Sequence, residues 1–138
     1  ALALGASAVN MGTRFMATAE APIHENVKQQ IVANDELDTI IVFREFDNTS
    51  RVARNSISEE IQRRSRIPGA SFADVAELAS GLRGRERVLR DGDIEGGMWW
   101  ASQAQGLIDD VPTCAELVTR IVDEASTIIE GRLASSLR

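Results

Sequence analysis

Several residue types are scarce in this sequence, and each scarcity argues against a class of site. There is no Tyr, and aromatic residues make up 4% of the 138 residues, so a base-stacking surface for nucleic acid is not expected. The single Cys114 has no partner for an internal disulfide and offers no thiolate cluster for a metal. Lys and Arg number 15 against 21 Asp and Glu, and a net charge of −6 argues against a nucleic-acid partner.

Long apolar runs and targeting signals are also missing. No apolar run approaches the roughly 20 residues that cross a bilayer, so no membrane contact is predicted. No basic segment precedes an apolar one, as it would in a signal peptide. A reducing, cytoplasmic setting is therefore expected. The chain begins at Ala1 inside a segment that looks helical, which predicts a piece of a longer protein.

A short apolar segment near the start ends in residues suited to phosphate binding. Ser7–Met11 is predicted to be a buried strand that stops at Gly12, before a new helix. Glycine permits close backbone approach, and free N–H groups at a helix start hold phosphate. Asn10, Met11, Gly12 and Thr13 are therefore candidate phosphate-binding residues. Gly-Thr pairs are also common in ordinary turns, so this pair alone leaves both interpretations open.

The first half of the chain alternates between helix and strand patterns. Pro22 suits the first turn of a helix that is predicted to stop near Asn34. The β-branched and aromatic run Thr39–Phe46 predicts the clearest strand. A second helix is predicted from Arg51, with Ser56 and Glu59 at capping-box spacing.

The second half is predicted to be mostly helical. Ser71 and Asp74 suggest the cap of a helix that Gly81 and Gly84 close, and Arg83–Arg90 is expected to be irregular. A further helix is predicted from Met98 to Ile108. Thr113 and Glu116 form the best capping box in the sequence. The last helix carries a wide apolar stripe that must pack on something large: Leu117, Val118, Ile121, Val122, Ala125, Ile128, Ile129 and Leu133.

The polar residues of the late segments suggest no catalytic set. The acidic residues of 91–95 lack EF-hand spacing, which favours a solvated turn and no metal site. One His and one Cys cannot form a catalytic triad, and His24 at a helix start is interpreted as structural. Ser102 and Gln103 form a small polar patch that could hydrogen-bond a ligand, and the residues alone do not decide this. No catalytic residue is predicted within the chain.

Several blocks together resemble the nitronate monooxygenases, formerly called 2-nitropropane dioxygenases. They occur in the order of that family and cover almost the whole chain. The blocks are Leu2–His24, Phe46–Asn55, Gly92–Gly97, Ala101–Pro112 and Ala115–Val118.

The resemblance implies an α/β fold, namely the C-terminal fragment of an FMN-binding TIM barrel with a small, mostly helical second domain. Residues 1–20 would then hold the last barrel strand and the FMN phosphate turn. Residues 21–110 would form the second domain, and residues 111–138 a helix that packs back on the barrel.

The resemblance also implies a cofactor and its ligands. In the family a Gln-Met-Gly-Thr segment grips the FMN phosphate, and here it stands as Asn10-Met11-Gly12-Thr13. Gln103 carries over from an Ala-Gly-Gln motif near the flavin, although Ser102 replaces the usual Gly. The family's active-site His has no counterpart in this chain, and His24 matches a non-catalytic position.

The implied enzyme is a flavin-dependent monooxygenase that oxidises alkyl nitronates with oxygen to carbonyl compounds and nitrite. This chain alone would lack the catalytic base and be inactive. Two alternatives remain open: a flavin-dependent enoyl-acyl-carrier-protein reductase, which shares the Met-Gly-Thr-Arg-Phe block, and a non-catalytic helical module. A homo-oligomeric state is also left open.

Overall fold

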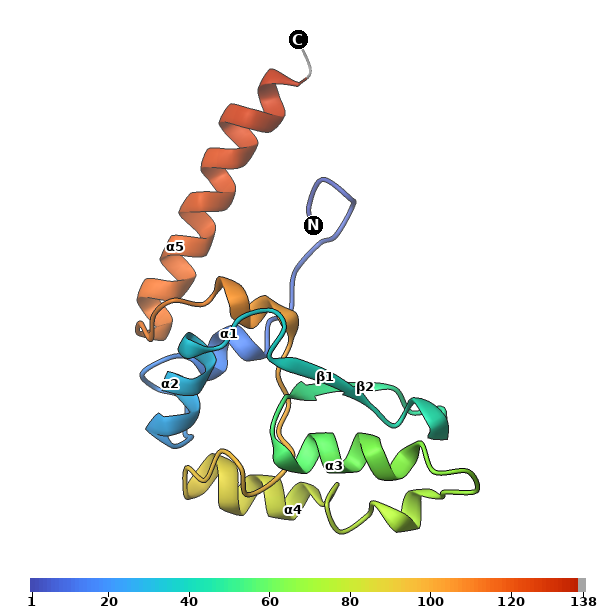
Figure 1. The fold of residues 1–138 in the computed structure, drawn as a ribbon. Coiled ribbons are helices and arrows are strands. Elements are labelled where there is room, and N and C mark those ends of the chain that lie inside the picture. The colour runs from blue at the N-terminus through green and yellow to red at the C-terminus, as the bar shows by residue number, and fades with distance from the viewer. Residues whose placement is uncertain (137–138) are drawn as a thin grey trace.

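A computed structural model describes residues 1–136 and shows an α/β chain with one long helix standing away from the rest (Figure 1). Among these residues no helix is both long and apolar enough to cross a membrane. The helices are α1 Thr13–Met16, α2 Glu25–Ala33, α3 Ser56–Ser65, α4 Gly81–Arg83 and α5 Cys114–Thr127; the strands are β1 Thr39–Val42 and β2 Ser50–Ala53. Wider π-type turns extend α4 over Gly84–Arg90 and α5 over Ile128–Leu133.

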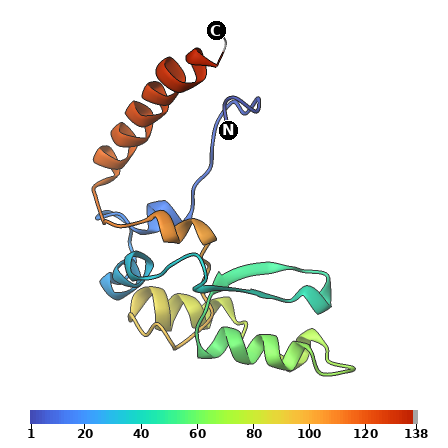
Figure 2. The ribbon, with the colours of Figure 1, turned by 45° about the horizontal axis from the view of Figure 1, so that its top comes forward.

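Two neighbouring clusters of buried side chains form the core. The first joins α2 to the helix after α4 and to the later loops, with Val27, Ile31, Val88 and Trp99 nearly or fully buried. The second lies between the β hairpin and α3, which run side by side in Figures 1 and 2. Its fully or almost fully buried members are Val42, Val52, Ile61 and Val75.

The hairpin differs from the predicted strand and helix. β1 pairs antiparallel with β2, with Ile40 opposite Val52. The strand predicted to reach Phe46 ends at Val42, because Phe43 adopts a left-handed backbone with φ 61° that breaks the ladder. The helix predicted from Arg51 is wrong, since this residue pairs with Ile41 in β2.

Two helical segments also start or end elsewhere than predicted. α3 begins at Ser56, and its capping box is Asn55 with Ser58 rather than Ser56 with Glu59. The Ser71–Asp74 box exists, but only a 3₁₀ turn, Phe72–Asp74, follows it.

The glycines of the α4 region do not close a helix. Gly81 and Gly84 lie within the helix that runs to Arg90, where an irregular segment was predicted. Gly84 packs so closely on the Met98 backbone that a Cβ there would overlap the carbonyl oxygen. A glycine at this position thus serves helix packing instead of helix termination.

The helix predicted from Met98 to Ile108 is replaced by extended chain and a 3₁₀ turn. The backbone N–H of Ala53 donates to the Trp99 carbonyl at 3.0 Å, and Val52 forms a β-bridge with Trp100. Only Gln103–Leu107 is helical, as 3₁₀ turns. The pairing with β2 therefore overrides the helical pattern of this segment.

Two predictions at the chain's ends have different outcomes. Ser7–Met11 is not a buried strand: no strand within residues 1–136 pairs with it, and Val9 is 56% exposed. The Thr113–Glu116 capping box is confirmed, with the Thr113 hydroxyl accepting from the Glu116 N–H at 3.2 Å. The apolar stripe of α5 is largely open to solvent. Val122 in this stripe is 55% exposed, although Leu117 is buried.

Candidate functional site

The predicted phosphate turn is a backbone feature at the start of α1. Gly12 caps this helix, and its carbonyl accepts from the N–H groups of Phe15 and Met16, both at 3.0 Å. Within residues 1–136 the N–H groups of Gly12, Thr13 and Arg14 have no acceptor. A Cβ on Gly12 would meet nothing within 4 Å, so the space beside it is open. Free N–H groups beside open space fit an anion such as a phosphate.

The structure brings the polar patch to this turn. The backbone N–H of Ser102 donates to Thr13 Oγ1 at 3.0 Å. Gln103 follows at the start of the 3₁₀ segment and is exposed. The turn and the segment that begins at Ser102 are therefore joined at one exposed surface, and the sequence indicates this juxtaposition only through the family resemblance.

An ion-pair bridge fixes α1 against α5. Asp110 accepts from Arg14 at 2.7 Å with one carboxylate oxygen and from Arg120 at 2.8 Å with the other. Arg14 also donates to the Asp110 carbonyl at 3.1 Å. The carboxylate raises the pKa of the Arg120 guanidinium above its ordinary value. This bridge holds the loop before α5 on the helix that follows the phosphate turn.

A cleft of about 410 Å³ opens beside the same bridge. Met11 and Arg14 line one side, and Leu107, Leu117 and Arg120 line the other. Of the five candidate cofactor residues only Met11 contributes to this cleft. Asn10, Gly12, Thr13 and Gln103 lie outside its lining.

Gln105 is a positioning residue that the sequence interpretation missed. Its side chain is fully buried, accepts from the Asn34 amide at 3.4 Å and donates to the Asp35 carbonyl at 3.0 Å. These bonds join the segment after Ser102 to the end of α2. The sequence offered only one signal for this role, a second Gln in the Ala-Gln-Gly sequence. The burial of Gln105 depends on the fold and could not be read from that signal.

His24, which the sequence interpretation took as structural, caps a helix. Its Nδ1 accepts from the Asn26 N–H at 3.1 Å at the start of α2.

Among the described residues no group of three or more His, Cys, Asp or Glu side chains could hold a metal. The pKa of Asp91 is lowered, chiefly by its hydrogen bond from the neighbouring Arg90.

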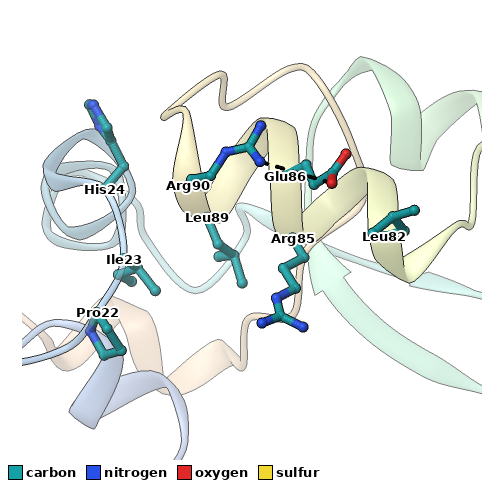
Figure 3. A pocket seen from close by; sticks show the side chains of 8 residues that line it. All are labelled: Pro22, Ile23, His24, Leu82, Arg85, Glu86, Leu89 and Arg90. Carbon is teal, nitrogen blue, oxygen red and sulfur yellow. Dashed lines mark ion pairs between the residues drawn. The ribbon is translucent and has the colours of Figure 1, made fainter.

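A cleft of about 880 Å³ near His24 was not anticipated from the sequence (Figure 3). It lies between the loop before α2 and the helix that α4 begins. Its lining is Pro22, Ile23, His24, Leu82, Arg85, Glu86, Leu89 and Arg90.

Comparisons with known proteins find one family model and several related proteins. The family model described as nitronate monooxygenase matches residues 1–124. A solved structure, FabK from Thermotoga maritima, superposes with a TM-score of 0.84 at 29% identity, covering 97% of this chain and 42% of FabK. A mutant of that FabK gives a TM-score of 0.78 at 28% identity, covering 97% of this chain and 39% of the mutant.

Two curated relatives are both named (3aS,4S,5R,7aS)-5-hydroxy-7a-methyl-1-oxo-octahydro-1H-indene-4-carboxyl-CoA dehydrogenase. The protein from Mycobacterium tuberculosis is 27% identical, covering 94% of this chain and 46% of its own length. The protein from Rhodococcus jostii is 30% identical, covering 95% of this chain and 47% of its own length. The chain thus spans about half the length of the curated relatives it matches.

Proposed function

The chain belongs to the nitronate monooxygenase family, and from this membership we propose that it forms the C-terminal, FMN-binding part of a flavin-dependent oxidoreductase. The observation that carries the proposal is the hydrogen bond that joins the Gly12–Thr13 turn to Ser102, the residue before Gln103. The turn offers unpaired N–H groups and open space to a phosphate.

FMN binding and orientation would be the work of this chain's own residues. The N–H groups of Gly12 and Thr13 would hold the phosphate, with Asn10 and Met11 completing the turn. Thr13 Oγ1 already accepts from Ser102, so its hydroxyl proton remains free to donate to a phosphate oxygen. Gln103 would donate its amide to the flavin. When bound, FMN supplies the electron transfer, and the protein supplies position and electrostatics.

The reaction we propose first is oxidation of an alkyl nitronate by oxygen to a carbonyl compound and nitrite. The family description supports this choice. We assign no catalytic base to this chain, because its single His accepts a hydrogen bond from a backbone N–H and caps α2.

Dehydrogenation of a coenzyme A thioester is the second candidate. Its support is that both curated relatives carry the name of a CoA dehydrogenase. In either case the chain would contribute the same flavin site, and the substrate would decide between the reactions. The enoyl-acyl-carrier-protein reductase alternative remains a prediction that the same experiment tests.

The architecture proposed for the whole protein is a TIM barrel with a small helical domain. Residues 1–20 form no strand among the described residues, and they would become the last strand by pairing with the rest of the barrel. Residues 21–110 would form the small domain, and residues 111–138 the helix on the barrel. The open apolar groove between α5 and the N-terminal segment supports this arrangement, since Leu2 and Val9 line it together with Val122 and Ile129. A large exposed apolar face is typical of a surface that another part covers.

The experiment uses the full gene product, saturated with FMN. Nitrite release and oxygen consumption with an alkyl nitronate are expected for the first candidate. Flavin reduction by an acyl-CoA thioester without oxygen would favour the second, and rapid NAD(P)H oxidation with an enoyl thioester would favour the reductase. A protein that binds no added FMN would overturn the proposal in favour of a non-catalytic module.

A further inference from the structure

The cleft beside His24 has no part in the proposed flavin site. Its volume of about 880 Å³ falls among ligand sites of roughly 300–1,000 Å³. Figure 3 shows Pro22 and Ile23 on one side and the helix carrying Leu82 to Arg90 on the other. The cleft is therefore large enough for a small organic ligand, and two separate elements form its walls.

Backbone and amide hydrogen bonds hold these walls together. The His24 N–H donates to the Leu89 carbonyl at 2.7 Å. The Asn26 amide donates to the Gly92 carbonyl at 3.1 Å, just beyond the same helix. Ile23 and Leu89 both pack on the first core cluster. Because these bonds and contacts exist before any ligand binds, little ordering would be needed on binding.

The helix that forms this wall is rich in arginine, and it lines the cleft with Arg85 and Arg90 against one acidic residue, Glu86. Leu82–Arg90 carries four Arg and one Glu, whereas the whole chain has a net charge of −6. Arg83 donates to the Gly96 carbonyl at 2.7 Å, and Arg90 is paired with Asp91 at 2.7 Å. Two of the four arginines are thus already engaged.

Arg85 is the arginine of the cleft that remains available. It is exposed, and it makes no ion pair or side-chain hydrogen bond with any residue from 1 to 136. In Figure 3 its guanidinium extends away from Glu86, which instead lies near Arg90 at 3.9 Å. His24 adds a donor at the cleft's edge, because Nδ1 accepts from Asn26 and leaves the proton on Nε2 in the neutral ring.

We propose that this cleft binds a small organic phosphate of the nucleotide class. A guanidinium recognises a phosphate through paired N–H donors, and Arg85 supplies an unpaired one. Ile23, Leu82 and Leu89 offer aliphatic surface for the adjoining ring. The shared chemistry is a phosphomonoester on adenosine, which both coenzyme A and NADPH carry on a ribose.

Binding is tested on the full gene product by calorimetry, with AMP as the probe and adenosine and inorganic phosphate as comparisons. AMP is expected to bind at least tenfold more tightly than adenosine. Arg85→Gln is expected to weaken AMP binding about tenfold and to leave adenosine nearly unchanged. Arg44→Gln, at an exposed arginine outside the cleft, is the matched control and should change the Kd less than twofold.

A second variant adds a repulsive charge without removing the arginine. Leu82 is 65% exposed, so Leu82→Glu should leave the helix folded and should weaken AMP binding more than adenosine binding. Amide NMR shifts on adding AMP should concentrate in residues 22–24 and 82–90. The proposal is overturned if AMP binds no better than adenosine, or if Arg85→Gln and Arg44→Gln have equal effects.

Two pairs of ligands distinguish whether the bound phosphate belongs to coenzyme A or to NADPH. Coenzyme A is compared with dephospho-coenzyme A, and NADPH with NADH, each pair differing by one phosphate. The pair whose difference disappears in Arg85→Gln identifies the ligand. Because the measurement is of binding alone, its outcome does not depend on the proposed flavin reaction. If neither pair shows such a difference, the proposed nucleotide site is wrong.

Discussion

The Ser102 backbone N–H donates to Thr13 Oγ1 at 3.0 Å, joining two residues 89 positions apart in the sequence. This bond places the start of the Gln103–Leu107 turn on the N-terminus of α1. Arg14, the next residue, is held by Asp110 at 2.7 Å. The loop between Ser102 and Asp110 is therefore attached to α1 at both of its ends, which fixes the surface that we assign to FMN.

Replacing Thr13 tests this surface directly. Thr13→Ala removes both the acceptor for Ser102 and the free hydroxyl proton, and we expect FMN to bind about tenfold more weakly. Thr13→Ser keeps the hydroxyl and should restore binding to within a few-fold. The measurement is the Kd for FMN from flavin fluorescence. Equal affinities for Thr13→Ala and the unaltered protein would contradict the assignment of Thr13.

The sequence predicts those elements that local chemistry determines. The capping box of Thr113 and Glu116 lies where its spacing indicates, with α5 following it. α2 ends at the predicted place, with Asn34 as its C-cap, although it begins three residues after Pro22. In these cases the residues that decide the structure are neighbours in the chain.

Elements that depend on distant partners were mispredicted. β2 has an ambiguous local sequence, and its pairing with β1 decides its conformation. The conformation of Trp99 also depends on a distant partner, because its carbonyl accepts from the Ala53 N–H in β2. Likewise, no local pattern places Ser102 on Thr13 or forms the cleft of Arg85.

Asn55 is expected to stabilise the fold by more than its role as a helix cap. Its side-chain oxygen Oδ1 accepts from the Ser58 N–H at 2.8 Å. Its side-chain NH2 group donates to the Ile94 and Gly97 carbonyls at 2.8 and 2.9 Å. Asn55→Ala should lower the free energy of unfolding by about 2–5 kcal/mol, because it removes the cap and leaves one buried and one partly buried carbonyl without this donor. Urea unfolding measures this loss.

Asn55→Asp separates the two roles of the side chain. A carboxylate still caps α3, since Asp and Asn cap about equally well, but it cannot donate to the two carbonyls. We therefore expect a clear loss of stability in Asn55→Asp. Stability equal to that of the unaltered protein would show that the cap alone matters.

Glu60 is expected to make stability fall in acid. Hydrogen bonds from Arg63 and Arg64 lower the pKa of its carboxyl from 4.5 to about 2. A lowered pKa in the folded state stabilises it above the unfolded pKa, and this contribution is lost as the pH falls from about 4.5 to 2. The difference in unfolding free energy between the unaltered protein and Glu60→Gln, which we call the stability gap, should thus be constant near pH 6. It should become smaller as the pH falls below 4.

The Glu60 pairs lie on the surface, so this gap should be small and should shrink in 1 M salt. Thermal unfolding of both proteins across pH 2.5–7 provides the measurement. A gap that stays constant down to pH 2.5 would contradict the proposed role of the two arginines.

Gly92 and Gly69 form a matched pair for testing how the cleft wall is built. Both have a left-handed backbone, with φ of 74° and 84°. An added Cβ at Gly69 meets nothing within 4 Å, whereas at Gly92 it would overlap the His24 ring. Gly69→Ala should therefore cost only the backbone strain, about 1–2 kcal/mol, and Gly92→Ala should cost more because His24 must move. If His24 is the obstacle, Gly92→Ala made in a His24→Ala background should cost no more than Gly69→Ala in urea unfolding. An undiminished excess in that background would show that the strain at Gly92 does not come from the ring.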